Sequence, residues 1–104
     1  MAGTAVVAKL TAADGKADEL KAVIADLVKA VDSGEPGTLV YAAAQDLDDP
    51  NVFWFYELYG STDAQAAHSS GQALVEAGGR MRGLLAGRPE VHHVTAVAAK
   101  GLPG

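Results

Sequence analysis

The spacing of apolar residues changes several times along the chain, and each change predicts a new structural element. Residues 4–11 (TAVVAKLT) are a short run rich in β-branched side chains, which predicts a strand. From Leu20 to Val31, apolar residues recur three and four positions apart, as they do on one face of an amphipathic helix. Gly34 and Pro36 follow this stripe and predict where the helix ends.

The rest of the chain predicts four further elements. Residues 37–45 and 52–59 are two β-rich runs separated by a short acidic turn, which favours an antiparallel hairpin. Residues 64–87 indicate a second helical region, but each glycine inside it weakens a helix by about 1 kcal/mol relative to alanine, so we expect a break there. Residues 90–100 predict a fourth strand.

The resulting order is β-α-β-β-α-β, the ferredoxin-like pattern of the α+β class. Right-handed connections would place both helices on one face of a four-stranded antiparallel sheet. No linker or low-complexity segment divides the chain, so residues 1–104 are expected to form one domain, with a loose tail at 101–104.

Residues 52–59 (VFWFYELY) are bulky and apolar on both faces of the predicted strand. Because side chains alternate in a strand, Glu57 shares one face with aromatic residues while Trp54 and Tyr56 share the other. Helices can cover one face, so the other needs a partner, and the simplest partner is a second copy of the chain. We therefore expect a homodimer joined by sheet faces, with Trp54 and Tyr56 in the interface. The alternative is a stacking platform for a flat ligand.

Charge and composition narrow the classes of partner. The formal net charge is -5 and the eight basic residues are scattered, so the chain has no basic stripe that would follow a nucleic acid backbone. No apolar run approaches the roughly 20 residues that span a bilayer, and no signal peptide is visible. The absence of cysteine is typical of a reducing compartment, and we expect a cytoplasmic protein.

Several short motifs, taken in order, resemble those of the antibiotic biosynthesis monooxygenase domains. That family has Glu-Pro-Gly before the second strand, Asp-Pro before the third, Glu-x-Trp at its end and a His nine residues later. Here Tyr59 stands at the Trp place and His68 lies nine residues beyond it, whereas Ala73 replaces a second His found in many relatives. The matching segments are EPGTLVY (35–41), DLDDPNVFWFYELY (46–59), AQAAHSS (64–70) and LLAGRPEV (84–91).

The resemblance implies a dimeric α+β barrel and a cofactor-independent oxygenase that oxidises an aromatic polyol, such as a quinol or an anthrone, with dioxygen. In that interpretation His68 is the base or anion stabiliser, because histidine suits proton transfer near neutral pH. Glu57 would orient or polarise it, and Tyr59 would donate a hydrogen bond to a ring oxygen. Phe55 and Tyr41 would line the substrate pocket.

A structural role for the same residues is the alternative. His68 shares a helical stripe with Ala64, Gly71 and Val75, which are mostly small and would leave space for a pocket above the sheet. Equally, His68 would fit as a core histidine bonded to Glu57 or to a backbone carbonyl.

No metal or organic cofactor is expected. His92 and His93 are neighbours in a strand and point to opposite faces, and the chain has neither cysteine nor a His-x-x-x-His pair. It also lacks the glycine motifs of dinucleotide and P-loop sites. The acidic turn at 46–49 lacks the full calcium-loop pattern and is expected to be a solvated loop.

Three rival functions remain at the sequence level. Related haem degraders use an Asn on the first strand with a Trp and a His, but residues 4–11 contain no Asn and the Trp place is Tyr59. A non-catalytic dimeric barrel that binds a ligand or is associated with stress would keep the fold without the chemistry. A small isomerase is the third possibility, because one fold hosts several activities.

Overall fold

The computed structural model describes residues 4–102, which form four strands and three helices. The expectation for the tail at 101–104 lies partly outside the described residues, since 103 and 104 are not among them. The strands are β1 (Thr4–Thr11), β2 (Thr38–Gln45), β3 (Val52–Tyr59) and β4 (Glu90–Thr95), and the helices are α1 (Ala17–Gly34), α2 (Thr62–Ser69) and α3 (Gln72–Met81).

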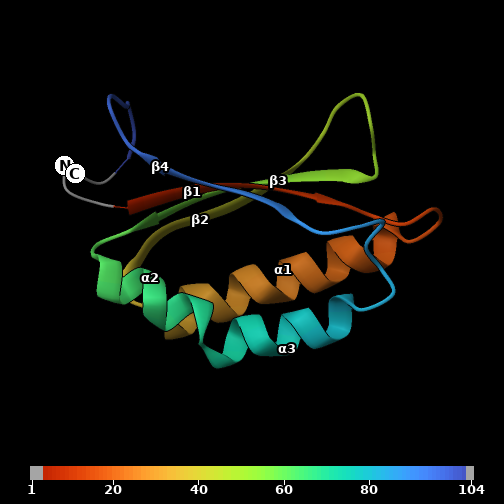
Figure 1. The fold of residues 1–104 in the computed structure, drawn as a ribbon, viewed down its shortest axis with the longest axis horizontal. Helices are drawn as coiled ribbons and strands as arrows, with labels where there is room; N and C mark the ends of the chain where they lie inside the picture. Colours follow the sequence, from red (N-terminus) through yellow and green to blue (C-terminus); the bar gives the residue numbers. More distant parts are fainter. Residues whose placement is uncertain (1–3, 103–104) are drawn as a thin grey trace.

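The strands make one antiparallel sheet in the order β2-β3-β1-β4. β1 and β2 run parallel with β3 between them, so the connection through α1 is the split βαβ unit of the ferredoxin-like fold. All three helices lie against one face of the sheet (Figure 1). The predicted fold class and the β2–β3 hairpin are therefore confirmed.

The core lies between α1 and the middle of the sheet. The predicted stripe of α1 is buried, with Leu20 completely covered. It packs with the side chains of β1 and β3 that point to the helix side, at Leu10, Phe53 and Phe55 among others. The five buried positions of α1 are Leu20, Val23, Ile24, Leu27 and Val31.

The second helical region is broken, as its glycines predict, and the break falls at Ser70–Gly71. Gly71 has extended backbone and is the N-cap residue just before α3, while its N–H donates to the carbonyl oxygen of His68. A Cβ at Gly71 would lie 2.9 Å from the carbonyl oxygen of Ala67, which is too close for any other residue. Because two short helices replace one long one, Val75 turns outward and is 61% exposed, so its expected place beside His68 is wrong.

The fourth strand is shorter than the predicted range of 90–100. Thr95 pairs with Thr4, the first residue of β1, so the ladder between the two strands ends there. Val97 beyond it is 92% exposed, and the expected alternation of faces does not continue past Thr95.

The sheet face without helices carries Trp54, which is 40% exposed. Its indole Nε1–H donates to Asp46 at 2.9 Å, and Lys9 Nζ lies 5.4 Å from the centre of the ring. The hydrogen bond from Trp54 is the main cause that lowers the pKa of Asp46. These contacts hold the indole in a fixed position on the face.

Leu20 gives a direct test of the core. Leu20→Ala removes a fully buried side chain and leaves a cavity between α1 and the sheet, so the free energy of unfolding should fall by about 2–5 kcal/mol. Urea denaturation measures this change. The exposed variant Val75→Ala is the control and should change stability by less than about 0.5 kcal/mol. Equal losses in the two variants would contradict this packing.

Candidate active site

A cavity of about 560 Å³ opens between the sheet and the pair of helices α2 and α3. This volume lies in the range of pockets that bind small organic molecules, about 300–1,000 Å³. Most of the lining is aliphatic or aromatic, and the polar groups Glu57, Tyr59 and His68 gather together in it. The apolar part includes Val6, Ala8, Leu10, Phe55, Leu74 and Met81.

The sheet supplies the floor of this cavity. Phe55, Glu57 and Tyr59 alternate along β3 and all line the cavity, as their spacing predicts. Tyr41 of β2 pairs with Glu57 in the ladder and therefore points to the same side. The rings of Tyr41 and Phe55 are 5.6 Å apart at their centres. Tyr41 therefore lines the cavity and also packs against Phe55.

His68 reaches the cavity from α2 and is only 4% exposed. Ser61 is the N-cap residue of α2, and its hydroxyl oxygen accepts a hydrogen bond from the N–H of Ala64 and so fixes the first turn. The imidazole packs against two tyrosine rings, with centres 4.9 Å from Tyr41 and 5.5 Å from Tyr59. These contacts restrict how the ring can rotate.

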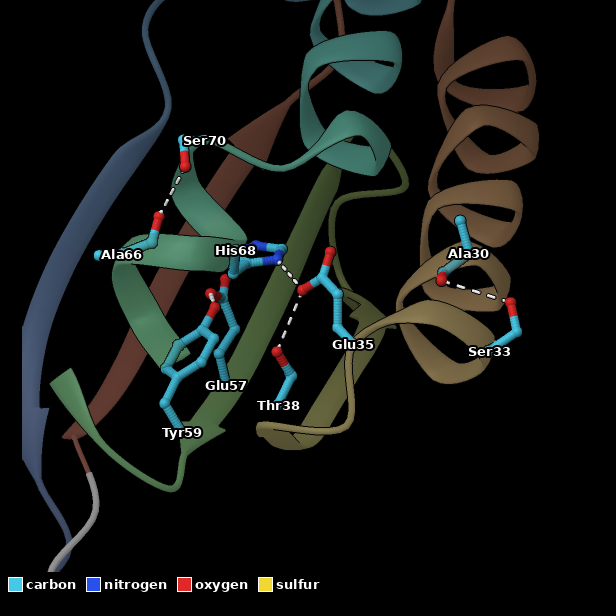
Figure 2. A network of polar contacts seen from close by, with 9 residues as sticks. All are labelled: Ala30, Ser33, Glu35, Thr38, Glu57, Tyr59, Ala66, His68 and Ser70. Atoms are coloured by element: carbon cyan, nitrogen blue, oxygen red, sulfur yellow. Dashed lines mark hydrogen bonds and ion pairs between the residues drawn. The ribbon is translucent and has the colours of Figure 1, made fainter. Parts of the chain in front are cut away.

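Glu57 and Tyr59 form a buried pair. The hydroxyl of Tyr59 donates to Oε1 of Glu57 at 2.5 Å, a distance typical of a hydroxyl donating to a charged or partly charged carboxyl group (Figure 2). Burial raises the pKa of Glu57, although this hydrogen bond acts in the opposite direction. Burial, followed by the same hydrogen bond and the charge of Glu57, also raises the pKa of Tyr59.

The partner of His68 differs from the one expected. Nδ1 of His68 lies 2.7 Å from Oε1 of Glu35, and Glu57 is engaged with Tyr59 instead (Figure 2). The direct contact with Glu57 is therefore corrected to one with Glu35, which stands just after α1. Likewise, the hydroxyl of Tyr59 donates its hydrogen bond to Glu57 in this structure. From the sequence, we expected it to donate to an oxygen of the substrate.

Some other polar residues that line the cavity were not identified from the sequence. His93 of β4 lines it, and His93 Nδ1 lies 3.0 Å from Nε2 of Gln65 on α2. Arg82, just after α3, also lines the cavity. Strand alternation alone would have separated His93 from His92, but which of them faces the helices depends on the register with β1.

Between residues 4 and 102, no group of three or more His, Cys, Asp or Glu side chains is placed to hold a metal ion. Within the same part of the chain, no helix is both long and apolar enough to cross a membrane.

Comparison with known proteins places the chain among small monooxygenase-like domains. The sequence profile of the antibiotic biosynthesis monooxygenase family matches residues 4–78. No curated protein matched the chain.

Solved structures agree in both fold and sequence. A candidate antibiotic biosynthesis monooxygenase from Caulobacter crescentus CB15 is 34% identical, with a TM-score of 0.86 over 92% of this chain and 91% of that one. Another from Chloroflexus aurantiacus J-10-fl is 28% identical, with a TM-score of 0.82 over 98% and 100%. A protein from Pseudomonas aeruginosa, at 24% identity and a TM-score of 0.84 over 94% and 97%, shares the fold.

The raised pKa of Glu57 predicts how stability changes with pH. The folded protein holds the Glu57 proton more tightly than the unfolded chain does, so this group favours folding most below its ordinary pKa of 4.5. That advantage is lost as pH rises through the raised pKa. Relative to Glu57→Gln, which cannot titrate, the wild-type protein should therefore lose stability between pH 4 and neutral pH.

Urea denaturation at a series of pH values measures this difference. Glu76→Gln, which changes an exposed carboxylate on α3, is the control and should follow the wild-type curve. Parallel curves for wild type and Glu57→Gln would show that the buried carboxyl is not perturbed in the folded state.

Proposed function

Because this chain belongs to the antibiotic biosynthesis monooxygenase family, we propose that it is a cofactor-independent monooxygenase that oxidises an aromatic polyol, of the quinol or anthrone type, with dioxygen. The observation that carries this proposal is the apolar cavity with a His, a carboxyl group and a tyrosine clustered in it. A flat aromatic substrate fits the apolar walls, and the polar cluster can take a proton from it.

The reaction begins with proton removal. His68 accepts a proton from a phenolic oxygen or from the methylene carbon of the ring system, which leaves an electron-rich anion. Tyr41 and Phe55 contact the ring system and hold its reacting edge near His68. The free oxygen of Glu57 meets a substrate oxygen, while Tyr59 acts through its hydrogen bond to Glu57.

The substrate supplies the electrons for the later steps. The anion passes one electron to dioxygen, and the resulting radical pair combines to form a C–O bond. The peroxide anion formed in this way takes back the proton held by His68 and then loses water, so one oxygen atom remains on the ring as a carbonyl group and the other leaves as water. The protein contributes the base, the position of the ring and the exclusion of solvent.

We also propose that two copies of the chain join through the sheet faces that carry no helix. Trp54 is 40% exposed and Val94 is 39% exposed on this face, so two large apolar side chains are left only partly covered there. Tyr56 lies two residues after Trp54 on β3, so it points to the same face, where it is half-buried. A second copy would cover these side chains and close the barrel.

The dimer is tested by light scattering at micromolar concentration, where a stable dimer is expected. Trp54→Glu places a charge in the proposed interface and should shift the protein towards monomer, because an unpaired charge is costly to bury. Val75→Glu puts the same charge on the helical side of the molecule and should leave the dimer intact. A wild-type monomer would contradict this part of the proposal.

The catalytic role of His68 is tested by oxygen uptake against a panel of quinols and anthrones, with protein freed of metal by a chelator. His68→Ala should lower the rate by about 10²–10⁴-fold while leaving the fold intact, since a general base typically contributes this much. Glu57→Gln should also lower the rate, and the two losses should not add if the residues act together.

Val75→Ala is the control for oxygen uptake and should keep the full rate. If His68→Ala keeps full turnover but melts at a lower temperature, His68 is a structural residue. Removal of a buried hydrogen-bonding group would then account for a loss of about 1–3 kcal/mol in stability.

A further inference from the structure

We propose that Glu35 is the positioning residue for His68: it holds the imidazole proton on Nδ1 and leaves Nε2 free to accept a proton. The inference rests on the proposed function, in which His68 is the base. It assigns a role to a residue that lies outside the cavity, on the far side of the imidazole from the substrate.

The contacts of Glu35 identify which nitrogen carries the proton. Oε1 of Glu35 accepts a hydrogen bond from the hydroxyl of Thr38 at 3.1 Å and lies 2.7 Å from Nδ1 of His68 (Figure 2). An ionised carboxylate has no proton to donate, so Nδ1 must be the donor in this contact. The distance of 2.7 Å is typical of a charge-assisted bond.

The second nitrogen of the ring remains available. Among residues 4–102, Nε2 of His68 forms no hydrogen bond. Every completely buried side-chain nitrogen or oxygen in these residues has a hydrogen-bond partner, so the unpaired Nε2 is not completely buried. In a neutral imidazole whose proton is on Nδ1, Nε2 has the lone pair that a base requires.

A groove behind the imidazole keeps Glu35 in contact with solvent. This groove has a volume of about 580 Å³ and is lined by Glu35 and His68. His68 also lines the cavity, so this residue borders both spaces. The side chain of Glu35 is 18% exposed. Glu57, in contrast, lies in the cavity, where burial raises its pKa. Of the two carboxyl groups, Glu35 is the one that contacts Nδ1 of His68.

Small residues set the distance between Glu35 and α2. A Cβ at Gly37 would lie 2.8 Å from Cβ of Ala64, so the turn that carries Glu35 packs directly on the helix. On the other side, a Cβ at Gly71 would lie 3.5 Å from Oε2 of Glu35. The N–H of Glu35 also donates to the carbonyl oxygen of Val31 at the end of α1. The carboxylate is thus held in place before any substrate binds.

Nitrogen NMR of protein labelled at histidine tests this inference, because the two ring nitrogens differ in chemical shift when only one is protonated. In the wild-type protein, at a pH where His68 is neutral, Nδ1 should carry the proton. Glu35→Gln presents an amide that can donate as well as accept, so the proton should move partly or wholly to Nε2. Glu76→Gln, which alters another carboxylate of the same groove, should leave the wild-type signals unchanged.

Oxygen uptake gives a second reading on the same variants. Loss of a carboxylate that orients a metal-bound histidine typically costs about 10–100-fold in activity, and we expect Glu35→Gln to lose a similar amount while Glu76→Gln keeps its rate. A purely structural Glu35 would lower the melting temperature without moving the proton.

A wild-type proton on Nε2, or an unchanged tautomer in Glu35→Gln, would overturn the role of Glu35. The wild-type spectrum is decisive by itself if Glu35→Gln does not fold. The proposed function fails separately: a proton on Nδ1 that depends on Glu35, without oxygen uptake on any quinol or anthrone, would support the positioning role and refute the oxygenase.

Discussion

The apolar character of β3 on both faces is the constraint on which the rest of the structure depends. β3 lies in the sheet between β2 and β1, and its residues must be covered both above and below. On the helix side, Phe53 and Phe55 join the core beneath α1. On the other side Trp54 stays partly exposed, held by Asp46. Because helices cover one face only, the same strand provides both the floor of a cavity and a surface that a second copy can cover.

The cavity exists because the side chains of α2 and α3 do not fill the space above the sheet. α2 and α3 are separated at Gly71, and the residues of α2 nearest the Glu35 turn are small, as Ala64 shows. One long helix with large side chains would cover the sheet as α1 does and would leave little room above β3. The glycines that weaken this region as a helix therefore also leave space for the cavity, which His68 lines.

Local patterns were enough to predict the elements and one face of the site. Strand alternation placed Phe55, Glu57 and Tyr59 together, and helical spacing gave the stripe of α1. The pairing of Glu35 with His68 could not be found in this way, since 33 residues separate them and no periodic pattern joins a turn to a helix. The predicted position of Val75 was wrong for a related reason. The break at Gly71 changes the direction in which every later residue of the helical region points.

The two carboxyl groups near His68 show why the environment of a residue, more than its type, decides what it can do. Glu57 is 8% exposed, and its burial raises its pKa above the ordinary value of a carboxyl group. Glu35 meets solvent and lies behind the imidazole, where it can only act through the ring. Similar tuning by burial separates acid from base in many enzymes. The fold fixes these environments through the break at Gly71 and the close packing at Gly37, and it is there that a relative with the same fold and a different chemistry would have to change.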